Sequence, residues 1–140
     1  MKQEDKELLL RVLCARLPYG VYGNYLNSDG SLSDDKLLRK VKIGYHDLIC
    51  ADGRDGMVLD GFLKPYLFPL SSMTEEQKRE YEDTLVYHDY TKGGWTIAKT
   101  FNDKYVIPYW FVDFCNKNHL DYRGLIPKGL AIDCSNLNIY

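Results

Sequence analysis

Residues 9–22 read LLRVLCARLPYGVY, and this stretch decides how the fold begins. Its apolar side chains recur at helical spacing, which predicts an amphipathic helix from about Glu4 to Leu17. Pro18 ends this helix, because proline disfavours helical geometry in the residue before it. Val21 and Tyr22 then open a β-rich segment, so we expect an α+β fold with an N-terminal helix.

The β-rich segment extends from about Tyr19 to Leu67 and alternates short apolar runs with turns rich in Asn, Asp and Gly. Lys36 to Tyr45 is its clearest strand candidate, because apolar and basic residues alternate there. The expected core face holds Leu37, Val41 and Ile43, and the expected outer face holds Lys36, Lys40 and Lys42. Further short strands are expected at His46 to Ala51 and at Met57 to Leu59. Together they predict a small antiparallel, strongly curved sheet, and an SH3-like barrel is one way to close it.

Prolines and capping residues organise the next segment. Lys64 to Leu70 contains two prolines, which argues against a central strand and favours an extended connector. A second helix is expected to begin at one of two candidate capping boxes and to run to about Tyr87. The two boxes are Ser72 with Glu75 and Thr74 with Gln77.

The last third of the chain completes the expected layout. His88 to Lys104 is interpreted as a loop with one strand near Trp95 to Lys99. A third helix is expected from near Pro108, which suits a first-turn position, to about Asn118. The tail from Asp121 to Tyr140 is expected to turn and dock on the core. We therefore expect a single domain over residues 1–140 with two helices beyond the first.

Composition and charge restrict the class of protein. The chain has 140 residues, of which 45% are hydrophobic and 27% charged, and its formal net charge is −2. This charge argues against binding to nucleic acid or lipid by bulk charge alone. The N-terminal residues are charged, and no apolar run approaches the ~20 residues of a membrane span. These observations predict a cytoplasmic protein without a membrane partner.

Few residues have a spacing that suggests chemistry. The four cysteines, Cys14, Cys50, Cys115 and Cys134, form no Cys-x-x-Cys pair and are expected to be free, mostly buried thiols. Cys115 and His119 are four residues apart, which would suit half a metal site or a thiol beside a base. A buried thiol near a helix-terminal histidine is the commoner arrangement. The aspartates near Gly53 and Gly56 are interpreted as turn residues rather than a metal site.

Common nucleotide-binding, serine-hydrolase and zinc-protease motifs do not occur in the sequence. No cofactor or metal is therefore predicted, and an enzyme is the less favoured interpretation.

Four stretches together carry a resemblance. They are Leu13–Val21 (LCARLPYGV), Lys64–Glu76 (KPYLFPLSSMTEE), Asp121–Ile126 (DYRGLI) and Lys128–Ala131 (KGLA). The chain resembles a family of short proteins found in gut Bacteroidales and in their phages and mobile elements. The resemblance implies a bacterial or phage setting and an accessory role, and it carries no activity to transfer.

Six polar-tipped residues in those stretches would form the rim of a pocket if they share one face. They are Arg16, Tyr19, Lys64, Tyr66, Tyr122 and Arg123. Tyrosine suits contact surfaces, and the chain has 12 of them, so the favoured hypothesis is a non-enzymatic module that binds another protein or a second copy of itself.

Two alternatives stay open. One is a nucleic-acid-binding protein that uses the basic strand of Lys36, Lys40 and Lys42, with tyrosines nearby to stack bases. The other is a metal- or thiol-dependent enzyme that uses Cys115 with His119, or the aspartates.

Overall fold

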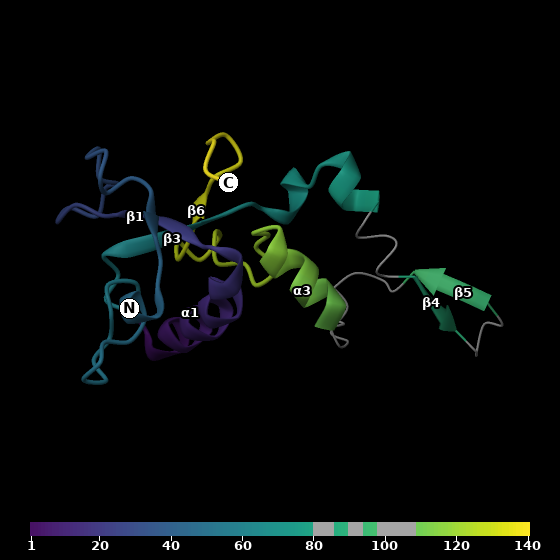
Figure 1. Ribbon diagram of the computed structural model, residues 1–140, viewed down its shortest axis with the longest axis horizontal. Coiled ribbons are helices and arrows are strands. Elements are labelled where there is room, and N and C mark those ends of the chain that lie inside the picture. Colours follow the sequence, from purple (N-terminus) through teal and green to yellow (C-terminus); the bar gives the residue numbers. More distant parts are fainter. Residues whose placement is uncertain (80–85, 90–93, 98–108) are drawn as a thin grey trace.

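The computed structural model describes residues 1–79, 86–89, 94–97 and 109–140, with side chains for 1–79 and 111–140 (Figure 1). Within these ranges four strands form one sheet in the order β2-β1-β3-β6. Strand β1 runs antiparallel to β2 and β3, whereas β6 runs parallel to β3. The strands are β1 (Tyr22–Tyr25), β2 (Val41–Lys42), β3 (Leu63–Leu67) and β6 (Ile132–Asp133).

In the described part of the chain, three α-helices and a two-stranded hairpin accompany the sheet. The helices are α1 (Gln3–Arg16), a helix that begins at residue 75, and α3 (Tyr109–Lys117). Strands β4 (Val86–Asp89) and β5 (Gly94–Ile97) pair with each other in a separate two-stranded sheet. Single 3-10 turns are η1 (Leu17–Tyr19), η2 (Tyr45–Asp47) and η3 (Leu70–Ser72).

Helix α1 covers one face of the sheet because its apolar stripe supplies that side of the core. Leu9, Val12 and Leu13 are buried against residues of β3 and its neighbours. The strand side of this core comprises Val21, Ile43, Leu63 and Leu67. A second cluster, formed by Phe111, Phe114, Cys115 and Leu120, joins α3 to Phe68 after β3. The fold therefore rests on two adjoining apolar clusters.

Local signals predicted the helices well. The predicted first helix differs from α1 by one residue at each end. Thr74 and Gln77 form the predicted capping box: the Thr74 N–H donates to Gln77 Oε1 (3.0 Å), and the Gln77 N–H donates to Thr74 Oγ1 (3.1 Å). The predicted helix end at Tyr87 is wrong, because that residue lies in β4. The predicted start of the third helix at Pro108 lies outside the described residues.

The sheet is open and mixed, so the predicted antiparallel, strongly curved sheet and its SH3-like closure are wrong. The predicted strand from Lys36 to Tyr45 shrinks to the two residues of β2. Asp35 explains the loss: its carbonyl accepts from the N–H groups of Leu38 and Arg39, which forms a turn. Leu37, expected in the core, is consequently 82% exposed.

The other short strands of this segment are also turns. Residues Tyr45–Asp47 form η2, and residues 57–60 form a further turn. Around the predicted Asp-Gly turn, a single antiparallel bridge joins Ile49 to Asp55. Polar turn chemistry therefore outweighs the apolar runs between β2 and β3.

Pro65 lies in the central strand β3, contrary to the predicted connector. The Leu26 N–H donates to the Phe62 carbonyl, so ladder alternation directs the polar groups of Phe62 and Lys64 toward β1. The nitrogen of Pro65 then points to the opposite side, where β6 pairs only from Tyr66 onward. No ladder hydrogen bond is lost, which is why the sheet tolerates this proline.

Candidate functional site

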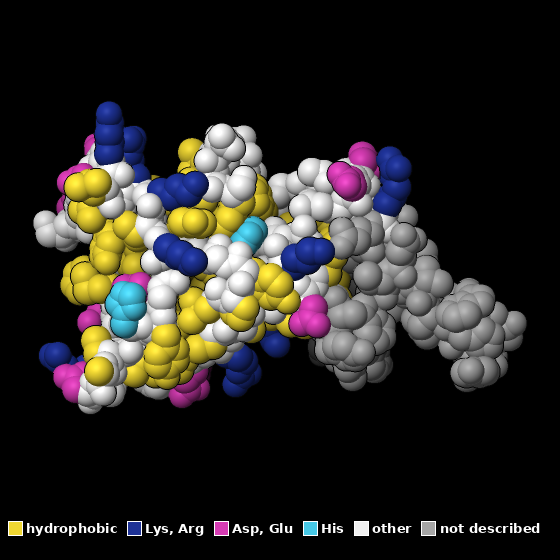
Figure 2. Space-filling view, viewed as in Figure 1, with side chains coloured by type: hydrophobic (Ala, Val, Ile, Leu, Met, Phe, Trp, Pro, Cys, Tyr) yellow, Lys and Arg dark blue, Asp and Glu magenta, His cyan; other side chains and the backbone are white. Residues whose placement is uncertain are grey.

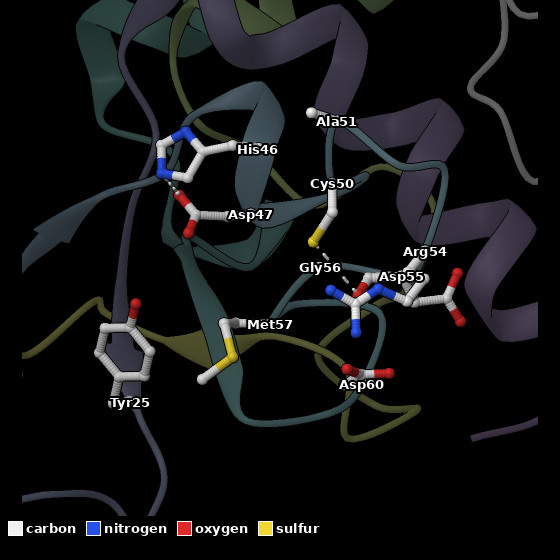
Figure 3. A pocket seen from close by; sticks show the side chains of 10 residues that line it. All are labelled: Tyr25, His46, Asp47, Cys50, Ala51, Arg54, Asp55, Gly56, Met57 and Asp60. Carbon is white, nitrogen blue, oxygen red and sulfur yellow. Dashed lines mark hydrogen bonds and ion pairs between the residues drawn. The ribbon is translucent and has the colours of Figure 1, made fainter.

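The segment between β1 and β3 forms one end of the molecule, and a pocket of about 530 Å³ opens there (Figure 3). We call it the loop-end pocket. Apolar and polar side chains line it together. They are Tyr25, His46, Asp47, Cys50, Ala51, Arg54, Asp55, Met57 and Asp60, with Gly56. This mixture of apolar and charged side chains is typical of a recognition site.

One side of the pocket is fixed by the turn η2. The Asp47 carboxylate accepts a hydrogen bond from the Gly44 N–H (2.8 Å), and the Asp47 N–H donates to the Gly44 carbonyl (3.0 Å). This reciprocal pair closes the turn and buries Asp47. The neighbouring His46 imidazole lies 3.4 Å from the carboxylate with its side chain 82% exposed. The turn therefore presents an exposed imidazole next to an anchored carboxylate.

The opposite wall meets this turn through close backbone contacts. The Gly56 N–H donates to the Leu48 carbonyl (2.7 Å). A Cβ atom at Gly56 would lie 2.3 Å from the carbonyl carbon of Asp47, closer than atoms can approach. Only glycine lets the two segments approach in this way.

The carboxylates that line the pocket outnumber the cations paired with them. Lys6 of α1 pairs with Asp55 (2.7 Å), and the hydrogen bond to this carboxylate raises the pKa of Lys6. Arg54 pairs with Asp52 outside the pocket (2.6 Å). Asp60 adds a further carboxylate to the lining. The pocket is thus net acidic, which favours cationic or hydrogen-bond-donating groups on a ligand.

The described residues contain no cluster of His, Cys, Asp and Glu placed to hold a metal ion. Burial and the Asp47 carboxylate raise the pKa of Tyr25, so its hydroxyl stays protonated and can donate a hydrogen bond. The arrangement can bind a ligand, and no nucleophile in the lining has a base in hydrogen-bond contact.

The six residues predicted as a rim have different surroundings in the structure. Arg16 and Tyr66 are buried. The Arg16 guanidinium donates to the carbonyls of Cys115 (3.4 Å) and Leu120, so it supports the end of α3. Three of the six do contact one another: the guanidinium carbons of Arg16 and Arg123 lie 5.3 and 5.5 Å from the Tyr122 ring centroid.

The other members of that set lie elsewhere. Lys64 and Tyr66 project from the face of β3 opposite the core, where the Tyr66 hydroxyl meets Asn24 Oδ1 (2.8 Å) and the Arg39 carbonyl (2.7 Å). Tyr19 is exposed in the η1 turn. A shared rim of all six stays a prediction.

The basic strand is only partly assembled. Lys42 lies opposite Tyr22 in the β1–β2 ladder, and Lys40 Nζ lies 4.9 Å from the Tyr22 ring centroid. Lys36 and Lys40 both precede β2, and of these two it is Lys40 that lies over the Tyr22 ring. Two of the three predicted lysines therefore surround one half-buried tyrosine.

Cys115 and His119 do not form a reactive pair. Burial raises the pKa of the Cys115 thiol to about 12, and burial with the nearby Arg16 charge lowers the pKa of His119 to about 4. Both groups are neutral at pH 7. His119 also lies beyond the end of α3, with a left-handed φ of 59°, so the four-residue spacing does not place it on one helix face with Cys115.

The four cysteines are free, as predicted. Cys115 and Cys134 are buried, Cys50 is half-buried and Cys14 is exposed, so the expectation of burial holds for part of the set.

Sequence inspection missed the loop-end pocket, because Tyr25 and Met57 come from separate segments joined only by the fold. The two glycines around Asp52 and Asp55 were visible, but they are as common in plain turns. No protein family, curated protein or solved structure matches the chain. Among the helices of the described ranges, none has the length and apolar content needed to cross a bilayer. The site must be interpreted from its own chemistry.

Proposed function

We propose that this chain is a non-enzymatic protein-interaction module of a bacterial or phage accessory system, and that it binds another protein through the loop-end pocket. The supporting observation is a group of large apolar side chains left exposed beside the pocket. Tyr45 is 59%, Met57 41% and Phe62 49% exposed. Tyrosine, phenylalanine and methionine are enriched in protein interfaces.

The backbone around these three side chains is linked to the pocket. Met57 lines the pocket, Tyr45 directly precedes His46, and the Phe62 N–H donates to the Met57 carbonyl (2.9 Å). Hydrophobic side chains gather over this end of the molecule, at the left of Figure 2. An apolar surface beside a pocket with a few polar groups supplies both the area and the orientation that a partner needs.

The experiment compares three forms of the chain as bait in lysate of the cells that produce it. Met57→Asp with Phe62→Asp places two charges in the surface, and Leu37→Asp is the control because Leu37 is more exposed but lies in another turn. We expect wild type and the control to retain the same protein, and the double variant to lose it. With that protein purified, the double change should weaken binding more than about tenfold, as for a hot-spot loss.

Two results would contradict this proposal. One is a partner that the double variant retains, and the other is the absence of any partner that wild type and the control share. Concentration-dependent dimers that the double variant alone fails to form would identify a second copy of the chain as the partner.

A second candidate function is single-stranded nucleic-acid binding by Lys40 and Lys42 around Tyr22. Its support is the 4.9 Å approach of Lys40 to the Tyr22 ring, with Lys42 opposite the same residue. A ring flanked by cations can stack a base while the cations meet phosphates.

Oligonucleotide binding tests this candidate. Affinity should fall with salt, with a log–log slope of about −2 if two or three phosphates are neutralised. Lys40→Glu with Lys42→Glu should abolish binding, whereas Lys36→Glu, in the turn before β2, should change it little. Binding that ignores salt, or that Lys36→Glu weakens as strongly, would exclude this surface.

A further inference from the structure

The hydroxyl of Tyr140 lies within the sheet. The Tyr22 N–H in β1 donates to it (3.1 Å), and it donates to the Tyr66 carbonyl in β3 (2.9 Å). The antiparallel register makes Tyr22 and Tyr66 the next hydrogen-bonding pair after Asn24 and Lys64. The phenol of Tyr140 therefore replaces a ladder hydrogen bond at the place where β1 and β3 separate.

The ring of Tyr140 is held by other rings. It stacks on the His119 imidazole, with centroids 3.5 Å apart and planes 10° apart. Tyr22 meets it edge-on at 5.8 Å, and Phe68 lies at 5.9 Å. We call the site formed by Tyr22, Tyr66, Phe68 and His119 the phenol slot.

The slot fills a gap along one edge of β3. Beyond Tyr66, the Phe68 N–H donates to the His119 carbonyl (2.8 Å), and the Asp121 N–H donates to the Phe68 carbonyl (2.8 Å). This edge thus passes from β1 to residues 119–121, and the Tyr140 hydroxyl lies between them. A donor and an acceptor of the backbone converge there on a single hydroxyl.

The walls of the slot are held by contacts that do not involve the tail. The Tyr66 hydroxyl is fixed by Asn24 and the Arg39 carbonyl, and Lys40 lies over Tyr22. His119 is set by the left-handed turn after α3. A site whose walls are fixed independently of its occupant is pre-organised, which favours binding.

The segment that carries Tyr140 is loosely attached by comparison. Residues 135–138 are exposed. The hydrogen bonds of Ser135 go to Asp133 (2.9 and 2.6 Å), and the Leu137 N–H donates to the Cys134 carbonyl (3.0 Å), so these bonds stay within the segment. Tyr140 is the side chain that bonds this segment to β1 and β3.

We propose that the phenol slot is a binding site for a tyrosyl side chain on an extended segment of a partner protein, and that Tyr140 occupies it as an intramolecular competitor. The chemistry selects a phenol, because its hydroxyl accepts from Tyr22 and donates to Tyr66 at once. A phenylalanine ring can do neither, and a carboxylate can only accept. The slot is separate from the loop-end pocket, so either proposal can fail alone.

The test uses the full chain and a synthetic peptide of residues 135–140, SNLNIY, with SNLNIF as its matched control. Binding is followed by NMR titration of the Tyr22 amide in wild type, Tyr140→Phe and Tyr140→Ala. We expect SNLNIY to bind Tyr140→Ala most tightly and wild type most weakly, because the tethered tail competes at high effective concentration. SNLNIF should bind Tyr140→Ala about tenfold more weakly, since two backbone groups lose their partner.

Equal binding of the two peptides to Tyr140→Ala, or no shift of the Tyr22 amide in that folded variant, would overturn the proposal. If Tyr140→Ala fails to fold, Tyr140→Phe, which keeps the ring, serves as the test. Tighter binding of SNLNIY to Tyr140→Phe than to wild type supports the slot. Equal binding to the two proteins rejects it. A dimer of wild type that Tyr140→Ala cannot form would replace the partner protein by a second copy of this chain. Leu137→Ala, in the same exposed segment, should behave as wild type.

Discussion

The Arg16 guanidinium is the most demanding single group in the core. It is fully buried, and among the described residues no carboxylate forms an ion pair with it. Burial lowers the pKa of Arg16, yet the carbonyls of Cys115 and Leu120 and the Tyr122 ring surround it. The negative end of α3 stabilises a cation at this place.

Arg16→Ala should therefore destabilise the fold strongly. The change removes two side-chain hydrogen bonds and opens a cavity in the core, and we expect a loss of about 3 kcal/mol in the free energy of unfolding. Urea denaturation measures it, with Arg11→Ala, an exposed arginine of the same helix, as the control. A loss no larger than that of the control would show that Arg16 does not support the end of α3.

His119 makes stability depend on pH. Its pKa in the folded protein is lowered to about 4 by burial and by Arg16, below the ordinary value near 6.5. The folded state therefore prefers the neutral imidazole, and this contribution is complete above pH 6.5 and is lost as pH falls toward 4. Since the ring is only partly buried, we expect it to contribute at most about 2 kcal/mol.

Unfolding curves between pH 7 and pH 4 for wild type and His119→Asn check this expectation. Asparagine tolerates the left-handed conformation of this residue, so the backbone should persist. The variant should lose less stability than wild type over this range. Parallel pH profiles would exclude His119 as the source.

At the scale of elements, the capping box decides where the second helix begins. Thr74→Ala removes the acceptor for the Gln77 N–H and should cost about 1 kcal/mol, whereas Thr74→Ser keeps the hydroxyl and should cost much less. Helical circular dichroism and urea denaturation measure both changes. Equal effects of the two substitutions would indicate that packing rather than capping fixes this helix start.

Elements with local causes could be predicted, and elements with distant causes could not. Pro18 and the Thr74 box act on neighbouring residues, so their effects are visible in the sequence. Pro65 was misinterpreted because its tolerance depends on which side of β3 carries a partner, and that partner is β6. Leu37 was predicted in the core from a regular alternation, but the turn formed by Asp35 outweighs that pattern and leaves Leu37 exposed.

The candidate sites show the same division at the scale of the whole molecule. The loop-end pocket combines Tyr25 with Met57, and the phenol slot combines Tyr22 with Tyr140, across long stretches of chain. No spacing in the sequence connects such residues. Only the turn character of the Asp-Gly cluster and the pairing of Lys40 with a nearby tyrosine had a local signal.

Thiol accessibility tests the arrangement of the whole molecule. Burial raises the pKa of Cys115 to about 12 and that of Cys134 to about 11, and both side chains are enclosed. With iodoacetamide at pH 8, Cys14 should be alkylated first, and Cys115 and Cys134 only after unfolding. Peptide mapping by mass spectrometry identifies the modified residues. Fast alkylation of Cys115 in the folded protein would contradict the buried second cluster.

The pairing of β3 with β6 has a consequence for the time course of folding. Tyr66 lies beside Ile132, so this parallel contact joins segments that are distant along the chain. Closing so long a loop costs conformational entropy before the contact stabilises the chain, so such contacts form slowly. Helix α1 and the β1–β3 ladder can assemble from nearer residues, so we expect the edge of β3 next to Pro65 to stay open until the segment around residue 132 arrives. During synthesis, that edge is the part of the nascent protein most exposed to pairing with a foreign strand.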